Sequence, residues 1–276
     1  MLRLNVNTEE IKKIILLKNN SSAPKSNLGE QKEGENILVK IKHEFIKGIP
    51  LVFLFNNTIE ESAKNGTVFF FHGLLSNKMG SQKEVVSLAE NGFLAVSIDN
   101  YAHGERRADD FDVRFHSNNP NFNDNFIDAI ERTADDATTV ADELFRRGII
   151  FEDKLGITGI SMGAFITYKV ISQDKRFKVA CPISGSAIWE GKDSSPHYNA
   201  DNFFPTALLI QHGEVDTSVP SCDDRELYRY LKPFYAENSE RLAYVEFANQ
   251  GHFMSDRDWN YLWQNVIIWF KEYLAK

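Results

Sequence analysis

Short apolar runs alternate with longer stretches of helical periodicity along most of the chain. The apolar runs predict strands at residues 67–71, 93–98, 154–160, 177–183, 206–211 and 242–247. The periodic stretches between them predict helices at residues 81–91, 123–147, 162–172, 221–231 and 258–274. Continuous apolar strands that alternate with helices are typical of a parallel sheet that is buried on both faces. We therefore expect an α/β fold with helices on both faces of the sheet.

Two further segments that are rich in strand-forming residues precede this alternating part of the chain. They span residues 37–46 and 49–55, and Lys47 and Gly48 lie between them. Two such segments joined by a short glycine-containing connection predict an antiparallel hairpin. With the six strands that follow, the expected sheet has eight strands and is mostly parallel.

The first 36 residues differ from the rest of the chain. Residues 19–36 are rich in Asn, Ser, Lys, Glu and Gly, which is typical of a solvated linker or a long loop. Before them, Thr8 could cap a short helix that would pack on its own domain, act as a lid or form an oligomer contact. We expect an N-terminal helix and linker at residues 1–36 and one larger domain at residues 37–276.

Bulk composition is that of an ordinary soluble globule, with 42% hydrophobic residues, 25% charged residues and a formal charge of −8. Because no long Lys and Arg cluster exists, neither nucleic acid nor an anionic membrane is an expected partner. Two cysteines, Cys181 and Cys222, are too few for a disulfide framework. The chain has no signal-peptide layout and no stretch near the ~20 apolar residues of a membrane span, so a cytoplasmic location is expected.

Ligands of open α/β sheets bind outside the carboxyl ends of the strands, so the residues after each strand are candidates for chemistry. The run Gly159-Ile160-Ser161-Met162-Gly163 lies where a predicted strand meets a predicted helix. Small residues on either side of a serine allow a sharp turn that exposes the hydroxyl group. This context predicts Ser161 as a nucleophile, and the Met162 backbone N–H as a donor to an oxyanion.

A second donor is expected in the run His72-Gly73-Leu74, which follows the strand predicted at residues 67–71. The backbone N–H of Leu74 is the candidate, because the loop after this strand faces the same edge of the sheet. We interpret His72 as a residue that packs the loop.

Asp216 and His252 complete a candidate set of reacting groups. Asp216 follows the strand predicted at residues 206–211, and His252 lies between the last predicted strand and the last predicted helix. A histidine can serve as general base when a carboxylate fixes its tautomer. Glu214 is the nearest competing carboxylate, whereas Asp223 and Asp224 suit the first turn of the next helix.

These motifs resemble those of the α/β-hydrolase superfamily, in which the reacting residues follow the chain order Ser, Asp, His. The chain is most similar to compact bacterial esterases near the dienelactone hydrolases, to feruloyl and cinnamoyl esterases, and to the catalytic domains of prolyl oligopeptidases. The resemblance runs from about Ile37 to the C-terminus and is carried by His72-Gly73-Leu74, residues 99–105, residues 159–163, His212-Gly213 with Asp216, and Gly251-His252.

Two departures accompany the resemblance. Residues 99–106 are similar to a structural D-x-x-G-H-G-x-S segment of the family, but Ala102 replaces a glycine and Arg106 a small residue. The nucleophile here is a serine, whereas true dienelactone hydrolases use cysteine. The resemblance implies a carboxylic ester hydrolase that acts on a small-molecule ester and needs no metal or organic cofactor. In agreement, the seven histidines show no metal-ligand spacing.

The stretch between the strands predicted at 177–183 and 206–211 is short, so any cap, at about residues 184–204, is expected to be small. Its aromatic residues Trp189, Tyr198 and Phe203 are candidates for substrate binding, or they cover the edge of the sheet. The phenylalanine-rich segment 106–126 could border the site or form the contact of a homodimer.

The leading hypothesis is a serine esterase that cleaves esters of small to medium acyl or aryl substrates through an acyl-enzyme. A peptidase or amidase of the prolyl oligopeptidase-like type is the alternative with the same fold. A hydrolase-fold binding protein without activity is the third hypothesis, although Ser161, Asp216 and His252 are all present.

Overall fold

The computed structural model describes residues 38–274 of the chain. The predicted N-terminal helix and linker at residues 1–36 lie outside the described residues, so the domain boundary at this point stays a prediction.

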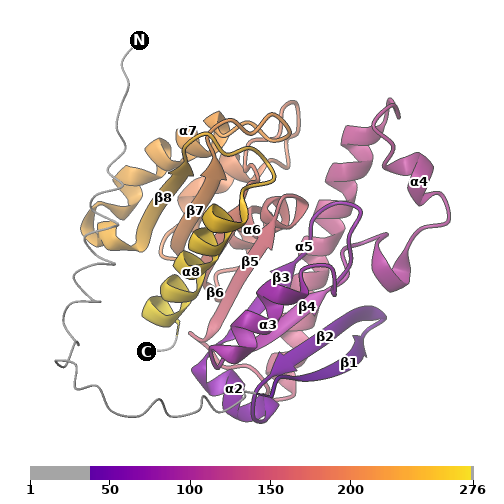
Figure 1. Cartoon of the computed structure of the whole chain (residues 1–276), viewed down its shortest axis with the longest axis vertical. Coiled ribbons are helices and arrows are strands. Elements are labelled where there is room, and N and C mark those ends of the chain that lie inside the picture. The colour runs from indigo at the N-terminus through magenta and orange to yellow at the C-terminus, as the bar shows by residue number, and fades with distance from the viewer. Residues whose placement is uncertain (1–37, 275–276) are drawn as a thin grey trace. The chain divides into compact units, whose positions relative to one another are not determined.

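An eight-stranded sheet forms the centre of the described unit (Figure 1). Its spatial order is β1-β2-β4-β3-β5-β6-β7-β8. The pairs β1–β2 and β2–β4 are antiparallel, and the other neighbouring pairs are parallel. The strands are β1 (Lys40–Ile46), β2 (Ile49–Phe55), β3 (Thr67–Phe71), β4 (Leu94–Ile98), β5 (Leu155–Ile160), β6 (Phe177–Ile183), β7 (Ala207–Gly213) and β8 (Leu242–Phe247). The expected mostly parallel sheet with an N-terminal hairpin is confirmed.

Helices cover both faces of this sheet. Figure 1 shows α3 and α8 in front of the strands and α5 and α6 behind them. The helices are α2 (Ile59–Asn65), α3 (Gln82–Glu90), α4 (Phe111–Arg114), α5 (Phe122–Arg146), α6 (Met162–Gln173), α7 (Cys222–Leu231) and α8 (Asp256–Tyr273), with the 3-10 helices η1 (Gly104–Arg106), η2 (Pro196–Phe203) and η3 (Lys232–Arg241).

The β1–β2 hairpin turns on two residues with positive φ angles, Lys47 at 49° and Gly48 at 82°. Two-residue turns with positive φ at both positions match the right-handed twist of the flanking strands. The turn therefore sets the register in which Ile46 faces Ile49.

Two short helices, α2 and α4, were not predicted from the sequence. They span seven and four residues, which is too short to show a helical period. The strand β7 extends to Gly213, so His212 lies within the strand instead of after it.

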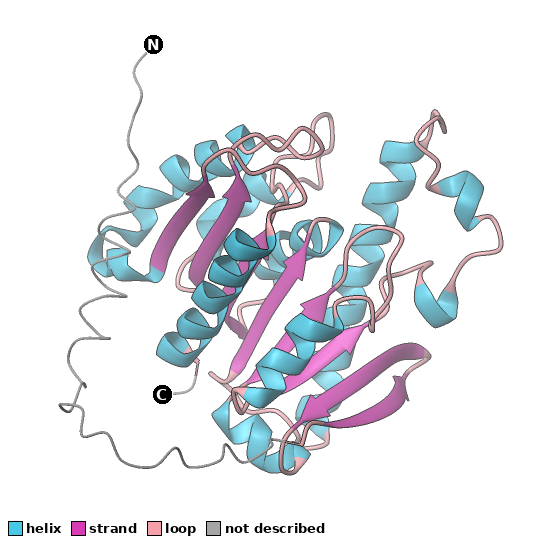
Figure 2. Cartoon of the chain, viewed as in Figure 1, coloured by secondary structure: helices cyan, strands magenta, loops and turns pink. Residues whose placement is uncertain are grey.

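The carboxyl ends of the parallel strands share one edge of the sheet, and Figure 2 shows that loops gather at this edge. All five residues of β3 and of β4 are buried, which makes these strands a rigid support for the loops. The segment between β6 and β7 contains only the short helix η2, so the cap is small as expected. Within residues 38–274, no helix has both the length and the apolar character needed to cross a membrane.

Candidate active site

Ser161 occupies a strained turn between β5 and α6. Its backbone has φ 55° and ψ −116°, a combination that residues with a side chain rarely adopt. Two glycines permit the turn. A Cβ atom on Gly159 would lie 2.3 Å from the carbonyl oxygen of Gly163, and one on Gly163 would lie 2.0 Å from that of Phe71. The turn therefore requires glycine at both positions, and it presents the Ser161 hydroxyl at the start of α6.

The loop between β8 and α8 brings His252 to Ser161. The Nε2 atom of His252 lies 2.9 Å from Ser161 Oγ, and its Nδ1 atom lies 2.7 Å from Asp216 Oδ2. Gly213 allows this approach, because a Cβ atom there would lie 2.5 Å from the carbonyl oxygen of Gly251. The structure thus joins the three predicted side chains in one chain of hydrogen bonds, the Ser161–His252–Asp216 array.

Asp216 is held by groups other than His252. Its Oδ1 atom accepts hydrogen bonds from the backbone N–H groups of Ser218, at 2.8 Å, and Val219, at 2.9 Å. Burial alone would raise the pKa of Asp216, but the Val219 N–H and His252 outweigh it, and the pKa lies below the ordinary value of 3.8. The carboxylate is therefore ionised at neutral pH and can fix the His252 tautomer. Glu214, the competing carboxylate, instead binds the backbone of the loop after β8.

A second histidine, His212, lies behind Asp216 and was assigned no role from the sequence. Its buried Nε2 atom lies 2.9 Å from the carbonyl oxygen of Val219 and 3.3 Å from Asp216 Oδ2. Its Nδ1 atom lies 2.7 Å from Asp224 Oδ2, and Tyr168 donates to the other oxygen of Asp224 at 2.6 Å. Burial lowers the pKa of His212, but the bond to Asp224 more than compensates and raises it above 6.5. Both ring nitrogens of His212 thus face an oxygen acceptor, which favours the cationic form of this histidine beside Asp216.

The turn after β3 borders Ser161. A Cβ atom on Gly73 would lie 3.7 Å from the Cβ atom of Ser161, so the backbone of this turn lies close to the hydroxyl group. His72 fixes the turn, because its Nδ1 donates to the Gly73 carbonyl at 2.8 Å and its Nε2 accepts from the Asn100 N–H at 3.1 Å. Burial lowers the pKa of His72 to about 4, so the imidazole is neutral at neutral pH. These contacts match the packing role that we expected for His72.

Two backbone N–H groups were predicted to bind an oxyanion. Leu74 lines the cavity beside Ser161, and Met162 is the first residue of α6. N–H groups in the first turn of a helix have no partner within the helix, and the helix dipole favours negative charge there. Leu74 thus lies near Ser161 and Met162 directly follows it, and their role in binding an oxyanion stays a prediction.

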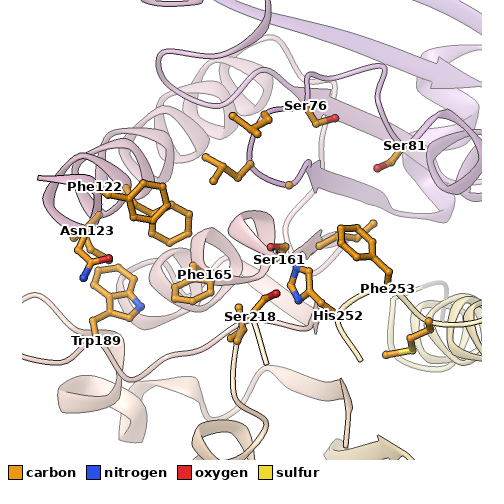
Figure 3. A pocket seen from close by; sticks show the side chains of 18 of the residues that line it. Ser76, Ser81, Phe122, Asn123, Ser161, Phe165, Trp189, Ser218, His252 and Phe253 are labelled. Carbon is orange, nitrogen blue, oxygen red and sulfur yellow. Dashed lines mark hydrogen bonds between the residues drawn. The ribbon is translucent and has the colours of Figure 1, made fainter. Parts of the chain in front are cut away.

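A cavity of about 840 Å³ opens in front of Ser161 (Figure 3). Aromatic, serine and carboxylate side chains all contribute to its lining. Residues that line it include Leu74, Ser76, Ser81, Glu84, Phe122, Phe126, Ser161, Phe165, Trp189, His252, Phe253 and Trp259.

Part of the chain matches a known protein family. Residues 81–198 match the model described as "Prolyl oligopeptidase family". The Bacillus subtilis (strain 168) protein named "Putative esterase YitV" is 23% identical over 249 residues, and the match covers 78% of this chain and 93% of that protein.

Solved structures share the architecture. TT1662 from Thermus thermophilus has a TM-score of 0.73 and 20% identity, over 87% of this chain and 99% of that one. A structure titled "Putative Dienelactone Hydrolase" from Klebsiella pneumoniae has a TM-score of 0.68 and 18% identity, over 86% of this chain and 100% of that one. The acylaminoacyl peptidase of Pyrococcus horikoshii has a TM-score of 0.67 and 18% identity, over 86% of this chain but 42% of that one. The protein has the α/β-hydrolase fold.

Several of these similar proteins are named for hydrolytic activities. Their names divide between esterases and peptidases.

Of the three predicted substrate-binding residues, the structure brings one to the cavity. Trp189 lines the cavity. Phe203 instead has no exposed surface and stacks on Tyr168 in the core, with ring centroids 6.0 Å apart. Tyr198 is 62% exposed and contacts the ring of His197 on the outside of η2. The prediction that Tyr198 and Phe203 line the site was wrong, because η2 turns one ring into the core and the other to solvent.

Several residues that line the cavity were not recognised in the sequence. Phe165 lies one helical turn after Ser161, and this spacing could have identified it. Glu84 and Trp259 come from α3 and α8, and their hydrogen bond of 2.7 Å joins residues that no sequence pattern connects. Within the described part of the chain, no three His, Cys, Asp or Glu side chains are grouped to hold a metal ion.

Proposed function

We propose that this α/β-hydrolase is a serine esterase that cleaves carboxylic esters of small to medium acyl or aryl substrates through an acyl-enzyme. The observation that carries the proposal is the Ser161–His252–Asp216 array, in which His252 contacts Ser161 Oγ at 2.9 Å and Asp216 Oδ2 at 2.7 Å. Distances of 2.6–3.2 Å between nucleophile and base suit proton transfer.

In the first half of the reaction, Ser161 Oγ attacks the acyl carbon of the ester and its proton passes to His252 Nε2. Asp216 stabilises the resulting imidazolium through Nδ1. When the tetrahedral intermediate collapses, the bond to the leaving oxygen breaks and His252 protonates that oxygen. The alcohol departs and the acyl group stays on Ser161.

In the second half, His252 takes a proton from water, and the hydroxide adds to the acyl carbon. Collapse breaks the bond to Ser161 Oγ, which regains its proton from His252, and the carboxylic acid leaves. The backbone N–H groups of Leu74 and Met162 bind the oxyanion of both intermediates.

We favour esters over amides as substrates because of the relatives that this chain matches over nearly their whole length. The match covers 93% of the protein named "Putative esterase YitV" and 100% of the structure titled "Putative Dienelactone Hydrolase". The acylaminoacyl peptidase is matched over 42% of its length. A peptidase remains the second candidate function, because residues 81–198 match the model described as "Prolyl oligopeptidase family". An inactive binding protein is disfavoured by the complete array.

A fluorophosphonate probe and a substitution at Ser161 test the proposal. The probe should label the wild-type protein but not Ser161→Ala, and this variant should lose at least about 10⁴-fold in kcat for p-nitrophenyl acetate. Ser172→Ala is the matched control, because Ser172 lies on the same helix and its hydroxyl donates to the Lys169 carbonyl. It should retain labelling and turnover.

Two results would count against the proposal. Full activity of Ser161→Ala would exclude this residue as the nucleophile. Faster turnover of aminoacyl-naphthylamides than of esters would make the protein a peptidase.

A further inference from the structure

We propose that an aromatic half of the cavity binds the acyl group of the substrate and selects an aromatic acyl group. This inference rests on the proposed function, because it uses Ser161 as nucleophile and His252 as proton donor. We call this half the aromatic lobe, and it is formed by Phe122, Phe126, Phe165 and Trp189.

Three separate elements build the aromatic lobe. Phe122 and Phe126 lie in the first turns of α5, and Trp189 lies in the segment between β6 and η2. Phe165 lies in the first turn of α6, where its backbone N–H bonds the Ser161 carbonyl oxygen at 3.2 Å. The lobe therefore begins one helical turn from the reacting hydroxyl group.

The position of His252 decides which part of the substrate enters the lobe. Figure 3 shows Phe165, Phe122 and Trp189 on one side of Ser161, and His252 with Phe253 on the other. His252 must protonate the leaving oxygen, so the leaving group lies on the His252 side. The acyl substituent then extends away from His252 into the aromatic lobe.

The aromatic lobe offers carbon surface to its occupant. Trp189 uses its ring N–H in a hydrogen bond to the Ser186 carbonyl oxygen at 3.1 Å, so the ring has no free polar group. Phe122, Phe126 and Phe165 are only half-buried and line the cavity, which leaves apolar surface uncovered there. Covering such surface favours an apolar acyl group over acetyl.

Ring geometry favours an aromatic occupant over an alkyl chain. Phe122 and Phe126 are stacked, with planes at 15° and centroids 5.9 Å apart. Phe165 meets Phe126 edge to face, at 84° and 5.3 Å. The lobe thus presents both ring faces and ring edges, and an aromatic ring gains from such contacts beyond its buried area.

A series of p-nitrophenyl esters with one leaving group tests the acyl selectivity. Phenylacetyl and octanoyl groups have the same number of carbons, so their comparison separates ring from chain. We expect kcat/KM for the phenylacetyl ester to exceed that for the acetyl ester by more than about tenfold, and that for the octanoyl ester by about threefold.

Two substitutions at Phe126 assign this selectivity to the lobe. Phe126→Ala should lower kcat/KM for the phenylacetyl ester about tenfold more than that for the acetyl ester. Phe126→Leu keeps most of the volume, so it should remove the advantage of phenylacetyl over octanoyl while octanoyl turnover is retained. Phe151→Ala removes a phenylalanine that is 40% exposed and should leave all three esters unaffected.

The outcomes separate the two proposals. If Ser161 is labelled and acetyl esters are cleaved but the phenylacetyl ester has no advantage, the aromatic acyl site is excluded and the esterase stands. Equal losses for all three esters in Phe126→Leu would also overturn the site. If Ser161 is not labelled and no ester is cleaved, the proposed function itself fails.

Discussion

The Asp216 Oδ2 atom that accepts the hydrogen bond of His252 also lies 3.3 Å from the Nε2 atom of His212. Asp216 therefore stands between two imidazoles. His212 is in turn held by Asp224 at 2.7 Å, which raises its pKa and favours its cationic form. A positive charge on His212 favours the ionised form of Asp216, the form that accepts the hydrogen bond of His252.

Replacing His212 by glutamine should lower kcat for p-nitrophenyl acetate about tenfold, or about 1.4 kcal/mol of activation free energy. The loss should be modest because the Ser218 and Val219 N–H groups still hold Asp216. Steady-state kinetics at pH 7 measures this effect. The variant should have the same midpoint of urea unfolding as the wild type, which shows that it is folded.

Tyr168→Phe is the control for His212→Gln. It removes the hydroxyl bound to Asp224 but leaves the His212–Asp224 pair, so kcat should fall less than about threefold. Wild-type kcat in a folded His212→Gln variant would show that the charge beside Asp216 does not act on the reaction.

The buried His72 makes stability depend on pH. Its pKa is about 4 in the folded protein and about 6.5 in the unfolded chain, so the unfolded state binds a proton first as pH falls. The contribution of neutral His72 is complete above pH 6.5. As the pH falls from 6.5 to 4, the free energy of unfolding should decrease by about 3 kcal/mol because of this residue.

Urea unfolding of the wild type and of His72→Gln at several pH values measures this loss. Glutamine does not titrate, and the carboxylates titrate in both proteins. The difference in unfolding free energy should therefore shrink as pH falls from 6.5 to 4. Parallel curves would contradict the role of His72.

The close packing at Gly163 predicts a large effect of one methyl group. In Gly163→Ala the new Cβ atom would lie 2.0 Å from the Phe71 carbonyl oxygen, so β3 and α6 must separate. We expect a loss of about 3 kcal/mol or more in unfolding free energy. The turn at Ser161 should also be displaced, with loss of fluorophosphonate labelling.

Gly148→Ala is the matched control for Gly163→Ala. Gly148 has a φ of 69° but nothing within 4 Å of the added Cβ atom, so only backbone strain of about 1 kcal/mol is expected. Thermal unfolding of both variants compares the two costs. Equal losses would show that contact with Phe71 is not what requires glycine at position 163.

Local patterns in the sequence determined the elements and the positions of the reacting side chains. The apolar runs of β3, β6 and β8 predict the strand limits without error, because a buried strand shows as a continuous apolar run between turn residues. Since parallel strands end at one edge, residues after β5, β7 and β8 were expected to meet, and Ser161, Asp216 and His252 do so.

Tertiary structure decided which side chains contact one another. Asp224 was correctly expected in the first turn of α7, but its contact with His212 depends on how α7 packs against β7. In the same way, Tyr198 and Phe203 share a short helix whose orientation sends neither ring into the cavity. The periodicity of a segment indicates which of its residues face the core. Hydrogen-bond partners and the walls of a pocket come from segments that are far apart in the chain, so periodicity does not predict them.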